Sequence, residues 1–201
     1  MNSVDGYPVV DHYYTIQGEG TYAGRAAYFI RLAGCDVGCP WCDTKESWSL
    51  DGHPVVSTAI LVHCAVSSGG AVVVVTGGEP TMHQLGPLVD SLHEAGLEVH
   101  LETSGAYEIT GAFDWVTLSP KKYSPPVAAN YPLVDELKVV VAHRSDFEWG
   151  ERHLIHCPDG VRASFQPEWG SPTMLPLIVE YVKEHPKWQI SLQTHKYLGV
   201  A

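Results

Sequence analysis

Three of the five cysteines in the chain, Cys35, Cys39 and Cys42, lie within eight residues and have the spacing C-x3-C-x2-C. Three thiolates so close together do not complete a tetrahedral zinc site without a fourth ligand. They can hold three corners of a [4Fe–4S] cluster and leave one iron free for an outside ligand. The segment therefore predicts an iron–sulfur centre with one open coordination position.

A zinc site remains an alternative to this centre. A C-x2-C pair alone is compatible with zinc or a redox dithiol, and Cys64, Cys157 or one of the eleven histidines could supply a fourth zinc ligand. A second motif favours the iron–sulfur centre, because Gly77-Gly78-Glu79-Pro80 follows a buried apolar run and begins 35 residues after Cys42. Glycines in that position let backbone groups approach a ligand closely.

Other polar residues stand where they could contact a ligand. Gln17-Gly18-Glu19-Gly20 places a carboxylate between two glycines, which fits either a ligand-binding loop or a plain surface turn. Arg31 lies inside an apolar run, where an unpaired charge is costly, so it must reach solvent or meet an anion. Asp43 and Thr44 follow the last clustered cysteine and offer oxygen ligands.

Alternating strands and helices are expected to position these groups. Apolar, β-branched runs predict strands, and apolar residues at helical spacing predict helices. We expect strands over 26–32, 71–75, 97–102, 115–118, 137–141, 163–165 and 189–192, and helices over 58–67, 84–95 and 172–184. Ser171 is expected to cap the last helix and Pro172 to begin it. Residues 7–20 are expected to form a polar, turn-rich segment.

This order predicts an α/β fold with a parallel sheet. The links over 105–113 and 119–136 are poor in helix, so we expect an open, trimmed partial (β/α) barrel. Such folds bind ligands at the carboxyl ends of the strands. The polar segments Thr103-Ser104-Gly105, Ser119-Pro120-Lys121 and Gln166-Pro167-Glu168 each follow a predicted strand.

Length and composition restrict the possibilities further. The 201 residues are expected to form a single domain, 1–201. A net charge of −11 argues against nucleic-acid binding, which needs clustered Lys and Arg. No apolar run approaches a membrane span, and the start Met-Asn-Ser-Val-Asp-Gly shows no secretory signal. Five cysteines, three of them clustered, fit the reducing cytoplasm better than a secreted disulfide framework.

The cysteine spacing and Gly77-Gly78-Glu79-Pro80, in this order, resemble the core of the radical S-adenosylmethionine (SAM) enzymes. Further segments resemble one family of that group, 7-carboxy-7-deazaguanine synthase, over essentially the whole chain. They are Tyr14–Gly20, Arg31, Cys42–Thr44, Thr76–Pro80, Ser119–Lys121 and Gln193–Lys196. The resemblance implies the radical SAM type of partial barrel. It also implies ring contraction of 6-carboxy-5,6,7,8-tetrahydropterin to 7-carboxy-7-deazaguanine with release of ammonia.

The resemblance also assigns roles by matching position. It implies a [4Fe–4S] cluster on the three cysteines, SAM used catalytically, and Mg²⁺ bound by Thr44. The SAM site would comprise Trp41, Cys42, Asp43, Gly78, Glu79, Ser104, Ser119, Pro120, Lys121, Gln166, Pro167, Glu168 and Trp169. The pterin substrate would contact Ile16, Gln17, Gly18, Glu19, Arg31, Thr76 and His195, with Arg31 on its carboxylate.

An external electron donor of flavodoxin or ferredoxin type and a homodimer are further implications of the resemblance. Two other functions share part of the pattern. A glycyl-radical activase would have the same cysteines and Gly-Gly-Glu-Pro segment but would not need Gln17–Gly20 or Arg31. A non-enzymatic iron–sulfur electron carrier would not need glycine loops at strand ends. The role of the chain end, Gly199-Val200-Ala201, is left open.

Overall fold

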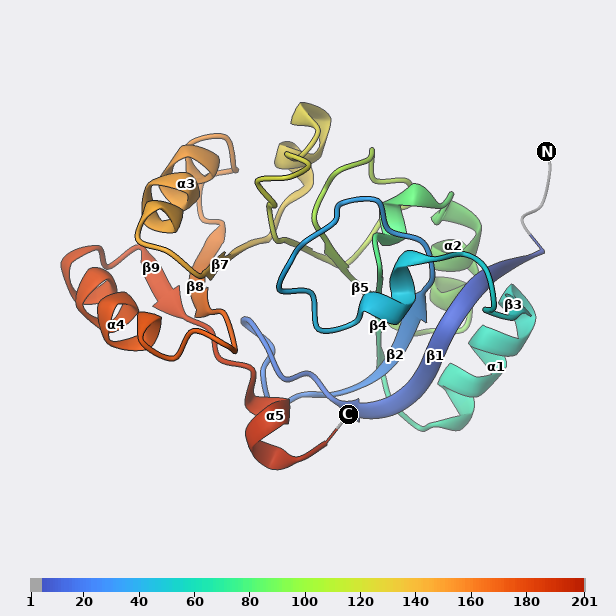
Figure 1. Cartoon of the computed structure of the whole chain (residues 1–201). Coiled ribbons are helices and arrows are strands. Elements are labelled where there is room, and N and C mark those ends of the chain that lie inside the picture. Colours follow the sequence, from blue (N-terminus) through green and yellow to red (C-terminus); the bar gives the residue numbers. More distant parts are fainter. Residues whose placement is uncertain (1–4, 201) are drawn as a thin grey trace.

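One sheet of nine strands, in the order β3-β1-β2-β4-β5-β6-β7-β8-β9, forms the centre of the computed structural model, which describes residues 5–200 (Figure 1). From β2 onward each neighbouring pair is parallel, whereas β1 pairs antiparallel with both β2 and β3. The sheet is open, since its edges β3 and β9 do not pair, as expected for a partial (β/α) barrel. The strands are β1 (Gly6–Ile16), β2 (Ala26–Leu32), β3 (Val55–Ser57), β4 (Val72–Gly77), β5 (Glu98–Thr103), β6 (Trp115–Leu118), β7 (Glu136–Val141), β8 (Arg162–Pro167) and β9 (Trp188–Ile190).

Two expectations concern the ends of the chain and the membrane. Residues 1–4, the start of the segment that shows no secretory signal, lie outside the described residues, and so does Ala201. Within residues 5–200, no helix combines the length and the apolar character that crossing a bilayer requires.

The prediction for residues 7–20 was wrong, because most of this segment is the long strand β1. Its register places Asp11 opposite Arg31 and Tyr13 opposite Phe29. The strand lies near the open edge of the sheet and leaves many polar side chains partly exposed, which hides the apolar alternation of a buried strand. The strand β1 therefore brings polar side chains beside Arg31.

Helices α1 to α4 pack against the sheet, whereas the short α5 lies at the cleft, and the helices agree with the sequence in part. They are α1 (Thr58–Ser67), α2 (Gly86–Glu94), α3 (Ser145–Leu154), α4 (Met174–Glu184) and α5 (Thr194–Leu198). The bounds of α1 match the prediction. The cap expected for α4 was wrong, because Thr173 occupies that position and makes no side-chain cap bond. Among the described residues, 105–113 and 119–136 contain no α-helix, as expected, only a short 3-10 helix at Ala128–Leu133.

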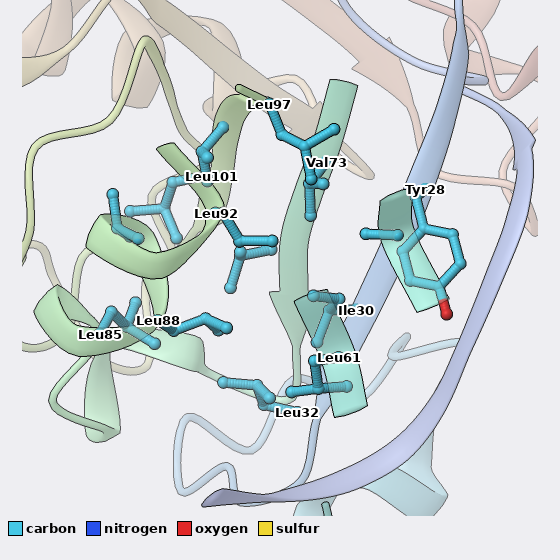
Figure 2. Packing of buried hydrophobic residues seen from close by; sticks show 14 of the residues in the cluster. Tyr28, Ile30, Leu32, Leu61, Val73, Leu85, Leu88, Leu92, Leu97 and Leu101 are labelled. Carbon is cyan, nitrogen blue, oxygen red and sulfur yellow. The ribbon is translucent and has the colours of Figure 1, made fainter. Parts of the chain in front are cut away.

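Apolar side chains between the helices and the sheet form the core. In the cluster shown in Figure 2, Leu88 and Leu92 of α2 pack with Val73 of β4 and Leu101 of β5. A second cluster lies under α3 and α4, where the rings of Phe165 and Trp188 stack with centroids 3.8 Å apart. Because strand side chains alternate between faces, the other face of the same strands is free to carry polar groups.

Candidate active site

A cleft of about 570 Å³ lies at the carboxyl ends of the parallel strands. Its walls include the cysteine loop, the ends of β4 to β8, the loop from β1 to β2, and the chain before and within α5. The cleft gathers every predicted site residue except Pro120: Ile16, Gln17, Gly18, Glu19, Arg31, Cys35, Cys39, Trp41, Cys42, Asp43, Thr44, Thr76, Gly78, Glu79, Ser104, Ser119, Lys121, Gln166, Pro167, Glu168, Trp169 and His195.

The three clustered cysteines are free thiols that face this cleft. Burial raises the pKa of Cys35 and of Cys39; at Cys39 the Lys121 charge opposes the rise, while Cys35 and Cys42 add to it. The Sγ atom of Cys42 accepts hydrogen bonds at 3.4 Å from the indole of Trp48 and from the Thr44 backbone. The three thiols thus share one partly buried environment and interact electrostatically, and a cluster would take the place of their protons.

Within residues 5–200, no group of three or more His, Cys, Asp or Glu side chains is already arranged to hold a metal ion. A cluster would therefore have to draw the three thiolates together. Neither of the other cysteines lines the cleft, since Cys64 packs against the first core cluster and Cys157 against the second. They do not provide the fourth ligand that a closed zinc site needs.

The end of β4 packs directly against the cysteine loop. A Cβ atom added to Gly78 would lie 2.4 Å from the carbonyl oxygen of Gly34 and 2.7 Å from Cβ of Cys35, so this close approach requires glycine. The next residue, Glu79, is buried and accepts hydrogen bonds from the backbone N–H groups of Thr81 at 3.0 Å and Ser104 at 2.8 Å. Glu79 therefore ties the ends of β4 and β5 together beside the cysteines.

Arg31 points into the cleft but already has protein partners. Its Nε atom donates to Asp11 at 3.0 Å and its Nη2 atom donates to the Tyr13 hydroxyl at 2.7 Å. Both partners belong to β1. The strand that the sequence did not predict therefore supplies the anion, Asp11, that pairs with the Arg31 charge. The Nη1 atom lies 3.5 Å from the hydroxyl of Thr44, which lies 3.3 Å from Asp43.

The segment before α5 covers the loop between β1 and β2 (Figure 1). The backbone and hydroxyl of Thr194 donate to the carbonyl of Gly18 at 2.8 Å and 2.9 Å, and Gln193 donates to Glu19 at 2.8 Å. A Cβ atom on Gly18 would lie 2.1 Å from Nδ1 of His195, so glycine is needed for this contact. Loop residues near position 18 and the chain end therefore form one wall.

The predicted SAM segments form another part of the lining. The ammonium of Lys121 donates to the Ser119 carbonyl at 2.7 Å and hydroxyl at 2.6 Å, and it lies 5.5 Å from the ring centroid of Trp41. At the end of β8, Gln166 accepts from Ser191 at 2.7 Å. An aromatic face, a partly buried cation and polar strand ends suit a ligand with a ring and a charged end.

Three charged residues of the cleft were given no site role from the sequence: Glu102, Lys138 and Lys196. Lys138 donates to Glu19 at 2.7 Å and to Glu102 at 2.8 Å, and Glu102 also accepts from Gln17 at 3.2 Å. The sequence did mark Glu102 and Lys138 as unusual, because each is a charged residue within or at the end of an apolar strand segment. Only the sheet register brings β5, β7 and the loop of Glu19 together.

The comparisons with known proteins were made at the level of sequence and of structure. No family model matches the chain. A protein of Synechocystis sp. named 7-carboxy-7-deazaguanine synthase is 50% identical over 194 residues, covering 96% of this chain and 93% of that protein. Proteins of the same name from Flavobacterium psychrophilum and Escherichia coli are 47% and 34% identical, over 96% and 97% of this chain and 92% and 99% of their own. The crystal structure of QueE from Escherichia coli matches with a TM-score of 0.84 at 33% identity, covering 94% of each chain.

Proposed function

The chain belongs to the 7-carboxy-7-deazaguanine synthase family, and from this we propose that it rearranges 6-carboxy-5,6,7,8-tetrahydropterin to 7-carboxy-7-deazaguanine with release of ammonia. The observation that carries the proposal is the single cleft that combines the three free cysteines with the Gly77-Gly78 strand end and Arg31. An electron carrier needs no such ligand cavity.

We propose that Cys35, Cys39 and Cys42 hold a [4Fe–4S] cluster. Together with SAM, such a cluster supplies the radical that removes a hydrogen atom from the substrate. In this assignment Trp41, Lys121 and the ends of β4 and β8 orient SAM. Glu79 contributes indirectly, by holding the ends of β4 and β5 in place, because its carboxylate already accepts hydrogen bonds from Thr81 and Ser104.

The substrate carboxylate is proposed to lie against Arg31. A guanidinium that Asp11 and Tyr13 hold in place is oriented before the ligand arrives, so little conformational freedom is lost on binding. Thr44, beside it, would offer a hydroxyl oxygen to Mg²⁺, which prefers oxygen ligands and would help to neutralise anionic groups of the substrate.

The polar edge of the pterin is proposed to face Gln17, Gly18 and Glu19, with Thr76 and His195 nearby. The hydrogen bonds from Thr194 and Gln193 hold the chain end against this loop. A closed wall of this kind keeps water and oxygen away from a radical reaction.

The partners belong to the same proposal. We propose an external donor of flavodoxin or ferredoxin type for the reducing electron, a homodimer as the assembled state, and the cytoplasm as the compartment. The free state of all five cysteines within the described residues is compatible with a reducing compartment.

The deciding experiment uses anaerobically purified protein with a reconstituted cluster. It is incubated with SAM, Mg²⁺, a reductant and 6-carboxytetrahydropterin, and the product, ammonia and remaining SAM are measured. We expect 7-carboxy-7-deazaguanine and ammonia in equal amounts without net loss of SAM. Intact cluster with SAM cleavage but no product would reject the proposal in favour of an activase, and zinc without iron or sulfide would reject the radical chemistry altogether.

A further inference from the structure

Lys138 is a buried cation between two carboxylates that come from different parts of the chain. Its side chain is 5% exposed and contacts Glu19, from the loop after β1, and Glu102, from β5. Each carboxylate places one oxygen on Lys138 and the other on an amide, from Gln193 at 2.8 Å and Gln17 at 3.2 Å. The arrangement fixes both carboxylates on the wall of the cleft.

We propose that Lys138 is a positioning residue for the substrate, which keeps the carboxylates of Glu19 and Glu102 side by side on the cleft wall. The inference rests on the proposed function, because it takes the pterin as the ligand of this wall. The aminopyrimidinone edge of a pterin carries several N–H groups, and carboxylates accept hydrogen bonds from such donors.

Electrostatics explains why the pair needs a lysine. Two neighbouring carboxylates disfavour each other's charge, and burial disfavours both. Burial acts to raise the pKa of Glu19, yet the charge and hydrogen bond of Lys138 and the hydrogen bond of Gln193 lower it to about 2. Burial raises the pKa of Glu102, and Lys138 only partly opposes the rise.

Other charged residues lie near Glu19, Glu102 and Lys138, and Lys138 is the cation that contacts both carboxylates directly. Glu136, two residues earlier on β7, adds negative charge and accepts from Thr21 at 3.0 Å and Ser164 at 3.2 Å. Lys121 is a second cation near this group, and the charge of Lys138 helps to lower the pKa of Lys121 after burial, the largest cause; His195 lines the cleft from the chain end. Without Lys138, Glu19 and Glu102 would compete for a single proton.

The test replaces Lys138 by methionine, which keeps length but removes charge. We expect Lys138→Met to raise the substrate KM about tenfold at neutral pH. Its KM should also fall more steeply with rising pH than that of the wild type, as the shared proton is lost. The control Lys187→Met, at an exposed position between α4 and β9, should keep the wild-type KM and pH profile.

A double variant separates positioning from plain loss of folding. Lys138→Met with Glu102→Gln removes one negative charge, and the new amide can donate to Glu19. We expect the double variant to have a KM close to the wild-type value, well below that of Lys138→Met. An unchanged KM in Lys138→Met, a parallel pH profile, or a double variant no better than the single one would each overturn the inference.

A second measurement works even if the proposed substrate is wrong. Failure of the wild type to convert 6-carboxytetrahydropterin would reject the proposed function. Amide hydrogen exchange of residues 17–21 would still test Lys138, because Glu19 lies in that segment. We expect exchange there to be at least about tenfold faster in Lys138→Met than in the wild type or Lys187→Met. Equal exchange in all three proteins would overturn the positioning role.

Discussion

At the scale of single residues, the cleft depends on side chains whose partners come from distant segments. Arg31 is the clearest case, because β1 supplies Asp11 and Tyr13 and the cysteine loop supplies Thr44. The sequence predicted that Arg31 must meet an anion or solvent, but it could not name the anion. Asp11 becomes a partner only through the antiparallel register of β1 with β2.

The first prediction concerns the guanidinium group of Arg31, which can contact a carboxylate at two points. Arg31→Lys keeps the charge, but one ammonium cannot hold Asp11 and Tyr13 and also contact a carboxylate at two points. We expect the substrate KM to rise about tenfold, or about 1.4 kcal/mol, with cluster content and SAM affinity unchanged. Steady-state kinetics with the substrate and an analogue lacking the carboxylate measure this.

The matched control is Arg25→Lys, whose arginine pairs with Glu98 at the opposite end of β5. It should behave as the wild type towards both compounds. If Arg31→Lys still prefers the carboxylate compound as strongly as the wild type does, Arg31 does not bind that group.

The second prediction assigns the cluster ligands. Replacing Cys35, Cys39 or Cys42 by alanine removes one of three thiolates, so each change should abolish the four-iron absorbance after anaerobic reconstitution. Cys64→Ala and Cys157→Ala should retain at least about half of the wild-type iron, because these side chains pack in the core. Full iron content in any of the first three variants would show that the ligands are misassigned.

At the scale of elements, the sequence predicted what depends on local apolar pattern. The buried parallel strands and the bounds of α1 agree with the structure, because strands covered on both faces are continuously apolar. The strand β1 was missed because it lies next to the edge of the sheet and many of its side chains are partly exposed, a setting that tolerates polar residues. The helix α3 was missed because Gly150, a weak helix former, stands in the middle of its sequence; a Cβ there would lie 2.7 Å from the ring of Phe165.

The third prediction concerns the contact of β4 with the cysteine loop. In Gly78→Ala the new methyl group would overlap the Gly34 carbonyl and Cys35, so the loop must move. We expect reconstituted iron content to fall by about half or more while the far-ultraviolet circular dichroism is unchanged. Gly86→Ala is the control, since its nearest neighbour would be 4.0 Å away. Equal iron content in both variants would mean that the close contact is dispensable.

At the scale of the whole molecule, the outer core carries a pH dependence separate from the cleft. His153 of α3 is buried and its Nδ1 atom lies 2.5 Å from the Tyr131 hydroxyl. Burial, together with the charges of His156 and Arg152, lowers the pKa of His153 to about 4. Below its ordinary pKa the unfolded chain binds a proton that the folded chain does not. His153 therefore makes the folded state less stable as the pH falls from about 6.5 towards 4.

The fourth prediction follows from that sign. His153→Gln can still contact Tyr131 but does not titrate, so it should be less stable than the wild type at pH 7. Relative to the wild type it should gain about 2 kcal/mol in the free energy of unfolding between about pH 7 and pH 5. Urea unfolding at the two pH values measures this, with the exposed His63→Gln as control. A stability difference that is the same at both pH values would contradict the prediction.

The contact between the first loop and the last segment also sets an order of events during synthesis. Gly20 donates to Ser191 at 2.9 Å across 171 positions of the chain, and Gly18 accepts from Thr194. A chain leaves the ribosome from its N-terminus, so the cysteines emerge long before the segment that covers the cleft. In a growing chain the thiols are therefore not yet covered by this last segment. Before release, iron and sulfide can reach the thiols while this segment is still absent, whereas in the finished chain they reach the thiols through the cleft.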